Sequence, residues 1–138
     1  MSFLNRFFSG KDQSKTPTNE EPKASPWLTI TKLEQIDYLK ELSKQNLVVI
    51  FKHSTRCGIS SMVWNRFQNN EYLEHEEVKF FYLDLLSYRD ISNEIAYEFQ
   101  VLHQSPQLII LKNQEVVHHS SHAAIDAGVL KELIEVKE

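Results

Sequence analysis

The chain has 138 residues, of which 41% are hydrophobic, and its formal net charge is −4. This length and composition are typical of one domain with its own hydrophobic core. Acidic residues outnumber Lys and Arg by 19 to 15, so the composition offers no basic surface for nucleic acid. The single cysteine allows no internal disulfide, which excludes a secreted disulfide scaffold and favours a reducing cytoplasm. No apolar stretch approaches the roughly 18 residues that suggest a membrane span.

Residues 1–26 are expected to form a flexible N-terminal tail and linker. The apolar residues near the start are interrupted by Arg6 and are not followed by a small-residue cleavage site, which does not fit a signal peptide. Between Ser9 and Pro26 the chain holds three of its four prolines among Lys, Ser, Thr, Asn and Glu, a composition typical of a linker. We therefore predict one folded domain over residues 27–138.

Within this domain the hydrophobic pattern predicts alternating strands and helices. Apolar runs predict strands at 27–30, 47–52, 78–83, 107–112 and 115–118. Helical spacing of apolar residues predicts helices after Thr31, from Cys57 to about Asn70, after Asp90, and around Val129–Ile134. Thr31 with Glu34 forms a capping-box pattern for the first helix, and Asp90 is the expected cap of the third.

The predicted order is β-α-β-α-β-α-β-β-α. Helical crossovers between the first three strands imply parallel pairing, and the short connection Asn113-Gln114 implies an antiparallel hairpin. The sequence therefore predicts an α/β fold with a mixed sheet covered by helices on both faces. A cysteine at a strand-to-helix junction, followed by a proline before the final hairpin, is the layout of a thioredoxin-like fold.

Cys57 is the predicted nucleophile because it follows a buried strand and opens a helix. Unpaired N–H groups and the positive dipole end at a helix start favour a thiolate. The helix end stabilises the thiolate by at most about 2 kcal/mol, so a nearby cation is expected to contribute as well. Arg56 is adjacent, and Lys52 and His53 are close in sequence, which makes all three candidates for tuning the thiolate.

Ser60 occupies the position at which a Cys-x-x-Cys protein carries its second cysteine. A disulfide formed on Cys57 must therefore be resolved by an outside thiol, which predicts monothiol exchange. Ser60 is either a hydrogen-bond donor toward Cys57 or a solvated helix residue.

The loop before the strand at 107–112 is the predicted substrate-facing segment. Ser105-Pro106 enters a buried strand, where a proline usually marks a special turn, often a cis one that leaves backbone groups free for a peptide-like ligand. His103 either lines the site or packs the turn. His118 and His119 are adjacent on a predicted strand and point to opposite faces, so we expect surface histidines and no metal site.

Three segments, at residues 51–60, 88–93 and 103–107, carry a resemblance to a known family. They read Phe-Lys-His-Ser-Thr-Arg-Cys-Gly-Ile-Ser, Tyr-Arg-Asp-Ile-Ser-Asn and His-Gln-Ser-Pro-Gln. In this order they closely resemble the YtxJ-like monothiol bacilliredoxins, over about residues 27 to 136. One departure is Gly58, which stands where the family often has proline.

The resemblance implies an enzyme that removes bacillithiol from S-bacillithiolated client proteins, with Cys57 as its nucleophile. A second bacillithiol would free the enzyme, and a separate flavoprotein bacillithiol-disulfide reductase would act indirectly. No bound cofactor is implied, because bacillithiol serves as an external co-substrate. Its malate carboxylates make Arg56 or Lys52 candidates for holding the ligand, with His103, Ser105 and Pro106 as further substrate-binding candidates.

Two alternatives remain open at this point. Cys57-Gly58-Ile59-Ser60 differs by one residue from the Cys-Gly-Phe-Ser signature of monothiol glutaredoxins that carry iron–sulfur clusters. Against that reading, Ser120-Ser121 stands where a Gly-Gly pair would hold glutathione. The other alternative is a non-enzymatic thioredoxin-like binding module, for which Cys57 would be unreactive.

Overall fold

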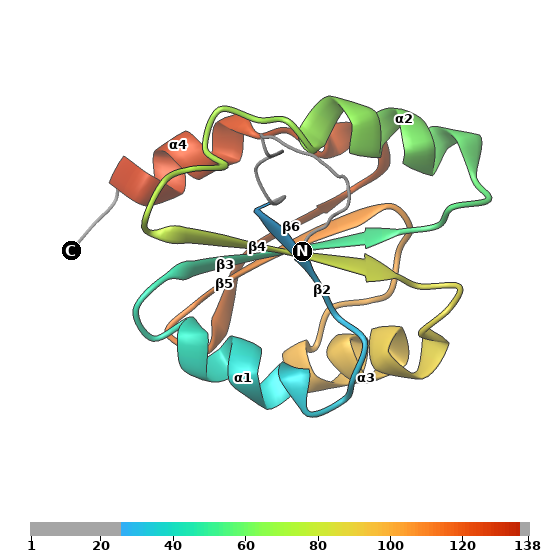
Figure 1. Cartoon of the computed structure of the whole chain (residues 1–138), viewed down its shortest axis with the longest axis horizontal. Coiled ribbons are helices and arrows are strands. Elements are labelled where there is room, and N and C mark those ends of the chain that lie inside the picture. The colour runs from blue at the N-terminus through green and yellow to red at the C-terminus, as the bar shows by residue number, and fades with distance from the viewer. Residues whose placement is uncertain (1–25, 136–138) are drawn as a thin grey trace, which may run out of the picture.

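A mixed sheet of five strands forms the centre of the structure, a computed structural model that describes residues 26–135 (Figure 1). The strands are β2 (Trp27–Thr29), β3 (Leu47–His53), β4 (Val78–Asp84), β5 (Gln107–Lys112) and β6 (Glu115–Ser121). The helices are α1 (Gln35–Leu42), α2 (Gly58–Phe67), α3 (Arg89–Phe99) and α4 (Gly128–Glu135), with a short 3₁₀ turn η2 (His122–Ala124). The predicted tail, apart from Pro26, lies outside the described residues. The predicted order of elements is confirmed.

The strands lie in the order β2-β4-β3-β5-β6. Strands β2 and β3 each pair with β4 in parallel, whereas β5 is antiparallel to β3 and β6 is antiparallel to β5. Asn113 and Gln114 have φ values of 52° and 69°. Because a two-residue type I′ turn needs positive φ at both positions, these values explain how β5 and β6 form a tight hairpin. The mixed pairing and the hairpin are confirmed.

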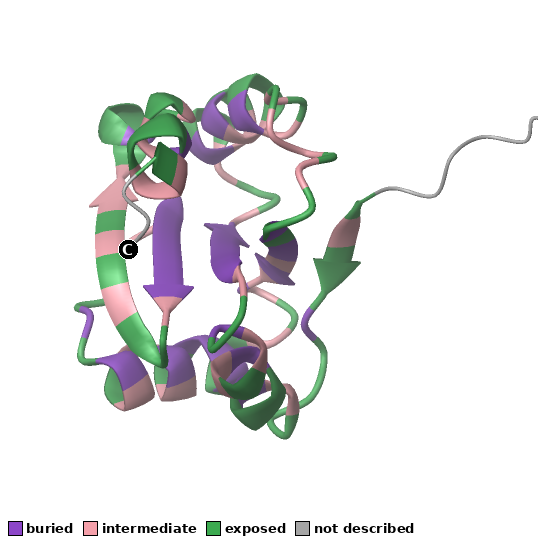
Figure 2. Ribbon diagram, turned by 90° about the vertical axis from the view of Figure 1, so that its left-hand side faces the viewer, coloured by how far each residue is buried: buried purple, intermediate pink, exposed green. Residues whose placement is uncertain are grey.

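The sheet separates two hydrophobic cores. Helices α1 and α3 cover one face and α2 and α4 cover the other, as Figure 1 shows. Strand β3 is buried along its whole length and β5 along most of it, whereas β6 alternates between partly buried and exposed residues (Figure 2). A strand buried on both faces reads as a continuous apolar run, which is the pattern of Leu47–Phe51.

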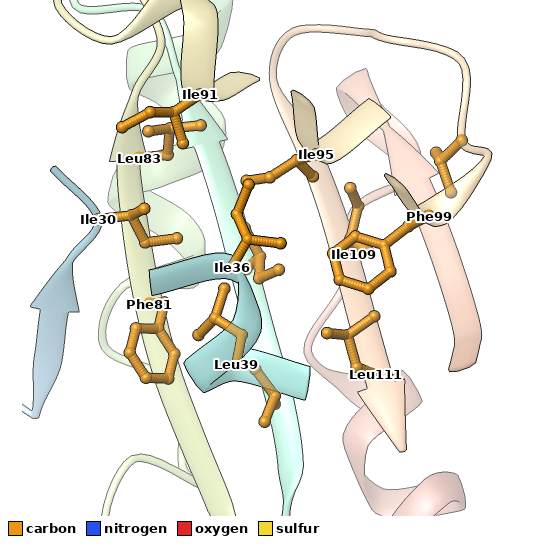
Figure 3. Close-up of a cluster of buried hydrophobic side chains, with 13 residues drawn as sticks. Ile30, Ile36, Leu39, Phe81, Leu83, Ile91, Ile95, Phe99, Ile109 and Leu111 are labelled. Atoms are coloured by element: carbon orange, nitrogen blue, oxygen red, sulfur yellow. The ribbon is translucent and has the colours of Figure 1, made fainter. Parts of the chain in front are cut away.

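We call the two clusters the α1/α3 core and the α2/α4 core. In the first, side chains of α1 and α3 point onto the sheet (Figure 3), and its largest members include Ile36, Leu39, Phe81, Leu83, Ile91, Ile95, Phe99, Ile109 and Leu111. The second contains Leu47, Val49, Phe51, Val63, Phe67, Val78, Phe80, Leu108, Ile110, Ile125 and Leu130. Residues of β3 alternate between the two cores, as the period of a strand requires.

An aromatic cluster attaches the edge strand β2 to the α2/α4 core. The ring centroids of Trp27 and Trp64 lie 4.8 Å apart in an edge-to-face arrangement, and Trp27 also lies 5.0 Å from Phe80. Trp64 in turn contacts Phe51, at 5.0 Å. The indole Nε1 of Trp27 donates a hydrogen bond to the carbonyl of Gln68, at 3.0 Å. The three-residue β2 is thus held by side-chain packing as well as by its pairing with β4.

Two predicted helix caps are wrong. Helix α1 begins at Gln35, and the Oε1 of Gln35 accepts hydrogen bonds from the backbone N–H groups of Thr31 and Lys32, so Glu34 does not close a capping box with Thr31. Helix α3 begins at Arg89 and its N-cap is Tyr88. The Oδ1 of Asp90 instead accepts the N–H of Ile91 inside the first turn. In both places a turn precedes the helix. The N-cap of α1 is therefore Glu34 rather than Thr31, and the N-cap of α3 is Tyr88 rather than Asp90.

The strands are slightly longer than predicted at their carboxyl ends. Strand β3 extends to His53, β4 to Asp84 and β6 to Ser121, because pairing with neighbours continues past the apolar run. Helix α2 ends at Phe67, earlier than predicted. Among residues 26–135, none of the helices is both long enough and apolar enough to span a bilayer.

Candidate functional site

The predicted site residues gather at one edge of the sheet. Because β3 and β4 are neighbouring and parallel, the loops that follow them leave the sheet at the same edge. The loop that precedes the antiparallel β5 returns to that edge as well (Figure 1). Residues 54–57, 85–88 and 102–106 therefore lie in three loops of one region. Lys52, His53 and Ser60 lie directly behind them.

Cys57 is the N-cap residue of α2, as predicted. Its backbone is extended, with φ −108° and ψ 122°, and its N–H donates to the carbonyl of Ser54, at 3.2 Å. The thiol is free and half-buried, and the first turn of α2 contains no acidic side chain. The thiol therefore lies at the positive end of the helix dipole, with no acidic side chain in the first turn of its own helix.

Ser60 is fully buried and faces His53. Its Oγ accepts the backbone N–H of Ser54, at 3.1 Å, and lies 2.7 Å from Nδ1 of His53. Burial lowers the pKa of His53 below its ordinary 6.5, although Asp84 partly opposes this change. Nδ1 of the neutral ring can therefore accept a hydrogen bond from the Ser60 hydroxyl, and the ring stacks on Trp64 with centroids 5.9 Å apart. The structure thus gives the Ser60 hydroxyl partners other than Cys57.

Lys52 is fully buried at the end of β3, on the face of the sheet opposite to that of His53. Its Nζ donates to the carbonyl of Ser92 in α3, at 3.2 Å, and lies 3.3 Å from Nδ1 of His103. Burial lowers the pKa of Lys52 to about 8, so the amine still carries its charge at pH 7. Its partners are a carbonyl and an imidazole rather than a carboxylate. An enclosed ammonium of this kind cannot contact a ligand.

His103 connects the loop before β5 to this buried lysine. The side chain is exposed, and its Nδ1 lies 3.3 Å from Lys52 Nζ and 3.4 Å from Ser92 Oγ. Partial desolvation lowers the pKa of His103, and the positive charges of Lys52 and Arg89 lower it further. The ring is therefore neutral at pH 7, and its Nδ1 accepts a hydrogen bond from the Lys52 ammonium. His103 packs the turn and also reaches the surface.

Ser105 and Pro106 complete the same loop. Their peptide bond is cis, as the sequence suggested for this turn. Gln107 closes the loop because its Nε2 donates to the carbonyl of Leu102, at 2.9 Å. Among the described residues, the Oγ of Ser105 is the one buried side-chain polar atom without a hydrogen-bond partner. A buried hydroxyl of this kind is available to a bound group.

Arg56, which precedes Cys57 in the chain, is exposed and lines a surface depression of about 400 Å³. The depression is lined by Thr55 and Arg56 from one loop, by Leu86 and Ser87 from the next, and by Arg89 at the start of α3. Arg89 was not predicted as a site residue, although it stands in one of the three segments that carry the family resemblance. The parallel pairing of β3 and β4 is the signal that could have found it, because the carboxyl ends of such strands share an edge.

His118 and His119 lie on β6, and His122 follows β6 beside the loop before β5, where its N–H donates to the carbonyl of Pro106, at 3.1 Å. His118 is half-buried on β6, with Nε2 3.1 Å from Ser120 Oγ, and burial lowers its pKa. His119 and His122 are exposed. In the part of the chain that the structure describes, no three His, Cys, Asp or Glu side chains are grouped so that they could hold a metal ion.

Comparison with known proteins agrees with this geometry. The family model described as monothiol bacilliredoxin BrxC matches residues 28–130, which span β2 to α4. The chain belongs to the monothiol bacilliredoxin family. Membership of this family and the position of Cys57 support a thiol redox function for the domain.

Solved structures similar to this bacilliredoxin domain share the thioredoxin fold. A thioredoxin-fold protein proposed to be an oxidoreductase is 26% identical, with a TM-score of 0.65, over 77% of this chain and 91% of that one. The thioredoxin from Schistosoma mansoni is 25% identical, with a TM-score of 0.60, over 82% and 97% of the two chains. A thioredoxin from Nicotiana alata is 20% identical, with a TM-score of 0.63, over 86% and 98%. The predicted thioredoxin-like fold is confirmed.

Proposed function

We propose that the protein removes bacillithiol from S-bacillithiolated client proteins by monothiol exchange at Cys57. The observation that carries the proposal is the pairing of a half-buried, free Cys57 at the start of α2 with a fully buried Ser60 where a second thiol would stand. Such a site can accept a mixed disulfide but cannot resolve it internally. Resolution must come from an outside thiol, for which bacillithiol is the proposed co-substrate, with no bound cofactor.

The reaction has two exchange steps. The Cys57 thiolate attacks the bacillithiol sulfur of the client mixed disulfide, so that a Cys57–bacillithiol disulfide forms and the client leaves as a thiolate that takes up a proton. A bacillithiol thiolate then attacks the bacillithiol sulfur bound to Cys57, releases the Cys57 thiolate and forms bacillithiol disulfide. The net reaction consumes one bacillithiol for each client restored. A separate flavoprotein reductase would return the disulfide to the thiol.

The surroundings of Cys57 suit a protein substrate. Three large apolar side chains are exposed on the first turns of α2 and in the loop before β5, namely Ile59, Met62 and Leu102, which are 58%, 68% and 81% exposed. Exposed apolar side chains beside a reactive group provide contact area for a partner protein. The buried Lys52 and the exposed Arg56 supply the positive charge proposed to favour the thiolate. A single cysteine suits a reducing compartment, so we propose that the protein works in the cytoplasm.

The decisive experiment follows the bacillithiol adduct by mass spectrometry. A client mixed disulfide mixed with the wild-type protein should transfer its bacillithiol to Cys57 once and then stop, and added bacillithiol should restart the reaction. Cys57→Ser should abolish transfer. Ser61→Ala, which changes a serine in the first turns of α2, is the matched control and should transfer normally.

Each alternative function predicts a different observation. A Cys57 thiol that fails to react with a client disulfide or with iodoacetamide would support a binding module instead. A brown protein after anaerobic purification would support an iron–sulfur carrier. Wild-type protein that cycles with a dithiol reductant alone and ignores bacillithiol would contradict the proposed co-substrate.

A further inference from the structure

The depression between the β3–α2 and β4–α3 loops presents two guanidinium groups to solvent. Arg56 and Arg89 are both exposed and line it from two sides, Arg56 from the β3–α2 loop and Arg89 from the start of α3. Neither arginine takes part in the salt bridges found within residues 26–135, which join Lys40 to Glu98 and Lys44 to Glu41. A guanidinium group is charged at every relevant pH and offers a planar fork of donors that matches a carboxylate. The depression therefore suits an anionic group.

The carboxylates near this depression are already engaged by the backbone. Asp84 Oδ1 accepts the N–H groups of Leu86 and Ser87, at 3.1 and 3.4 Å, and its Oδ2 accepts the Ser87 hydroxyl. Asp90 Oδ1 accepts the N–H of Ile91, at 2.9 Å. Both acids thus hold turns together rather than pairing with the arginines. The positive charge of Arg89 also reaches the neighbouring loop, since it lowers the pKa of His103.

The depression adjoins the loop that carries the reacting cysteine. Arg56 immediately precedes Cys57, and the N–H of Cys57 closes the turn that contains Thr55 and Arg56. A small molecule whose sulfur reacts at Cys57 can therefore extend its remaining groups over the two arginines. Lys52, the other sequence candidate for a ligand contact, is fully buried and cannot do this.

We propose that this depression binds the carboxylates of an acidic low-molecular-weight thiol while its sulfur is exchanged at Cys57, and that Arg89 is the residue that selects for those carboxylates. The proposal rests on the proposed function, because bacillithiol is the acidic thiol that it names. Two arginines, one in the β3–α2 loop and one at the start of α3, match a ligand with two carboxylates. Arg89 acts on the ligand, whereas Arg56 acts on both the ligand and the adjacent thiolate.

The test uses the full chain in its reduced form and two disulfide probes. Bacillithiol disulfide carries carboxylates, and hydroxyethyl disulfide is neutral. In either reaction the Cys57 thiolate forms a mixed disulfide with one half of the probe and releases the other half as a thiolate. Mass spectrometry of quenched samples gives the rate of adduct formation for each probe.

Wild-type protein should react faster with bacillithiol disulfide than with the neutral probe at low salt. Arg89→Gln should slow the acidic probe about five-fold, which is what an exposed arginine–carboxylate pair contributes, and should leave the neutral probe unchanged. Arg89→Lys should restore part of the rate because it keeps the charge but loses the fork. Lys131→Gln on α4 is the matched control, since it removes one exposed positive charge outside the depression.

The outcomes separate this inference from the proposed function. If wild-type protein prefers the acidic probe and Arg89→Gln keeps the full preference, the inference is wrong and the proposed function stands. Equal slowing of both probes would make Arg89 a residue that tunes the thiolate, which also overturns the inference. If wild-type protein forms no adduct with bacillithiol disulfide but reacts with the neutral probe, the proposed function itself fails. Circular dichroism of each variant checks that the exposed substitution leaves the fold intact.

Discussion

Lys52 and His53 are consecutive residues at the end of one strand, and both are buried, yet they lie in different environments. Lys52 points toward α3 and donates to the carbonyl of Ser92. His53 points toward α2, where its Nδ1 meets the hydroxyl of Ser60 and its ring stacks on Trp64. Burial lowers the pKa of both side chains, but Lys52 is still charged at pH 7 and His53 is neutral.

The difference shows how one strand end serves the site in two ways. On the α1/α3 side, an enclosed ammonium supplies positive charge behind the loops that carry Cys57 and His103. On the α2/α4 side, a neutral imidazole holds Ser60 in the place where a dithiol protein would have its second sulfur. Charge and hydrogen bonding are thus separated by the sheet, and substitutions on each side should have different signatures.

The largest expected effect is the alkaline pH dependence of Lys52→Met. Below pH 8, wild type carries the full cost of burying an ammonium, and the unfolded chain binds more protons than the folded one between about pH 8 and 10.5. The free energy of unfolding of wild type should therefore rise with pH across this window, relative to the variant, by up to about 3 kcal/mol. Urea unfolding at pH 7.5 and 10.5 measures the change. Lys79→Met, at an exposed position of β4, is the control. The enclosed charge would be contradicted if the difference in stability between Lys52→Met and wild type did not vary with pH.

Ser60→Ala should have the next largest effect, and it acts on stability rather than on exchange. The substitution leaves Nδ1 of His53 and the N–H of Ser54 without their partner, which costs about 1–3 kcal/mol of unfolding free energy. The first transfer of bacillithiol to Cys57 should be largely unchanged, because that step needs only one thiolate. Urea unfolding and single-turnover transfer, each compared with Ser61→Ala, check both statements. A large fall in transfer with unchanged stability would mean that Ser60 acts on Cys57 directly.

His53→Asn should reduce the sensitivity of the fold to acid. Because burial lowers the pKa of His53, the unfolded chain binds more protons below the ordinary imidazole pKa of about 6.5, so wild type loses stability as the pH falls through this range. The asparagine amide can accept the Ser60 hydroxyl without titrating. As the pH falls, the variant should therefore lose less stability than wild type or the exposed-site control His119→Asn. This difference should be smaller than the alkaline change expected for Lys52→Met. Thermal unfolding between pH 5 and 7.5 provides the comparison, and parallel curves for all three proteins would refute a buried neutral ring.

The smallest expected effect is a gain of stability in Gly58→Pro. A Cβ at Gly58 would meet no atom within 4 Å, and the residue is the first of α2, where proline is well accommodated. The substitution should raise the unfolding free energy by about 0.4–1 kcal/mol, chiefly by restricting the unfolded chain. A higher melting temperature with an unchanged iodoacetamide reaction of Cys57 is the expected result. A lower melting temperature would show that α2 needs a freer first turn.

The fold could be predicted from the sequence because its signals are local. The continuous run before Lys52 marks a strand buried on both faces, and Asn113-Gln114 marks a hairpin turn. The helix caps could not be predicted as reliably, because Thr31 and Asp90 look like caps in isolation. The starts of α1 and α3 depend instead on turns that involve Gln35 and Tyr88.

The candidate site was predicted only where position in the sequence decides it. Cys57 at the start of α2 is such a case. The burial of Lys52 against a carbonyl of α3, and the contact of Ser60 with His53, depend on how helices settle on the sheet and could not be predicted from spacing. Arg89 was missed because its neighbours in space follow a different strand.

Both tryptophans of the chain lie in the aromatic cluster on the α2/α4 side, with ring centroids 4.8 Å apart. The tryptophan fluorescence of the protein therefore comes from one place, where β2 meets α2. A local opening of the α1/α3 core would leave this emission unchanged, whereas circular dichroism would register the loss of α1 or α3. Agreement between the two optical signals during unfolding is consequently a direct measure of whether the two sides of the sheet unfold as one unit.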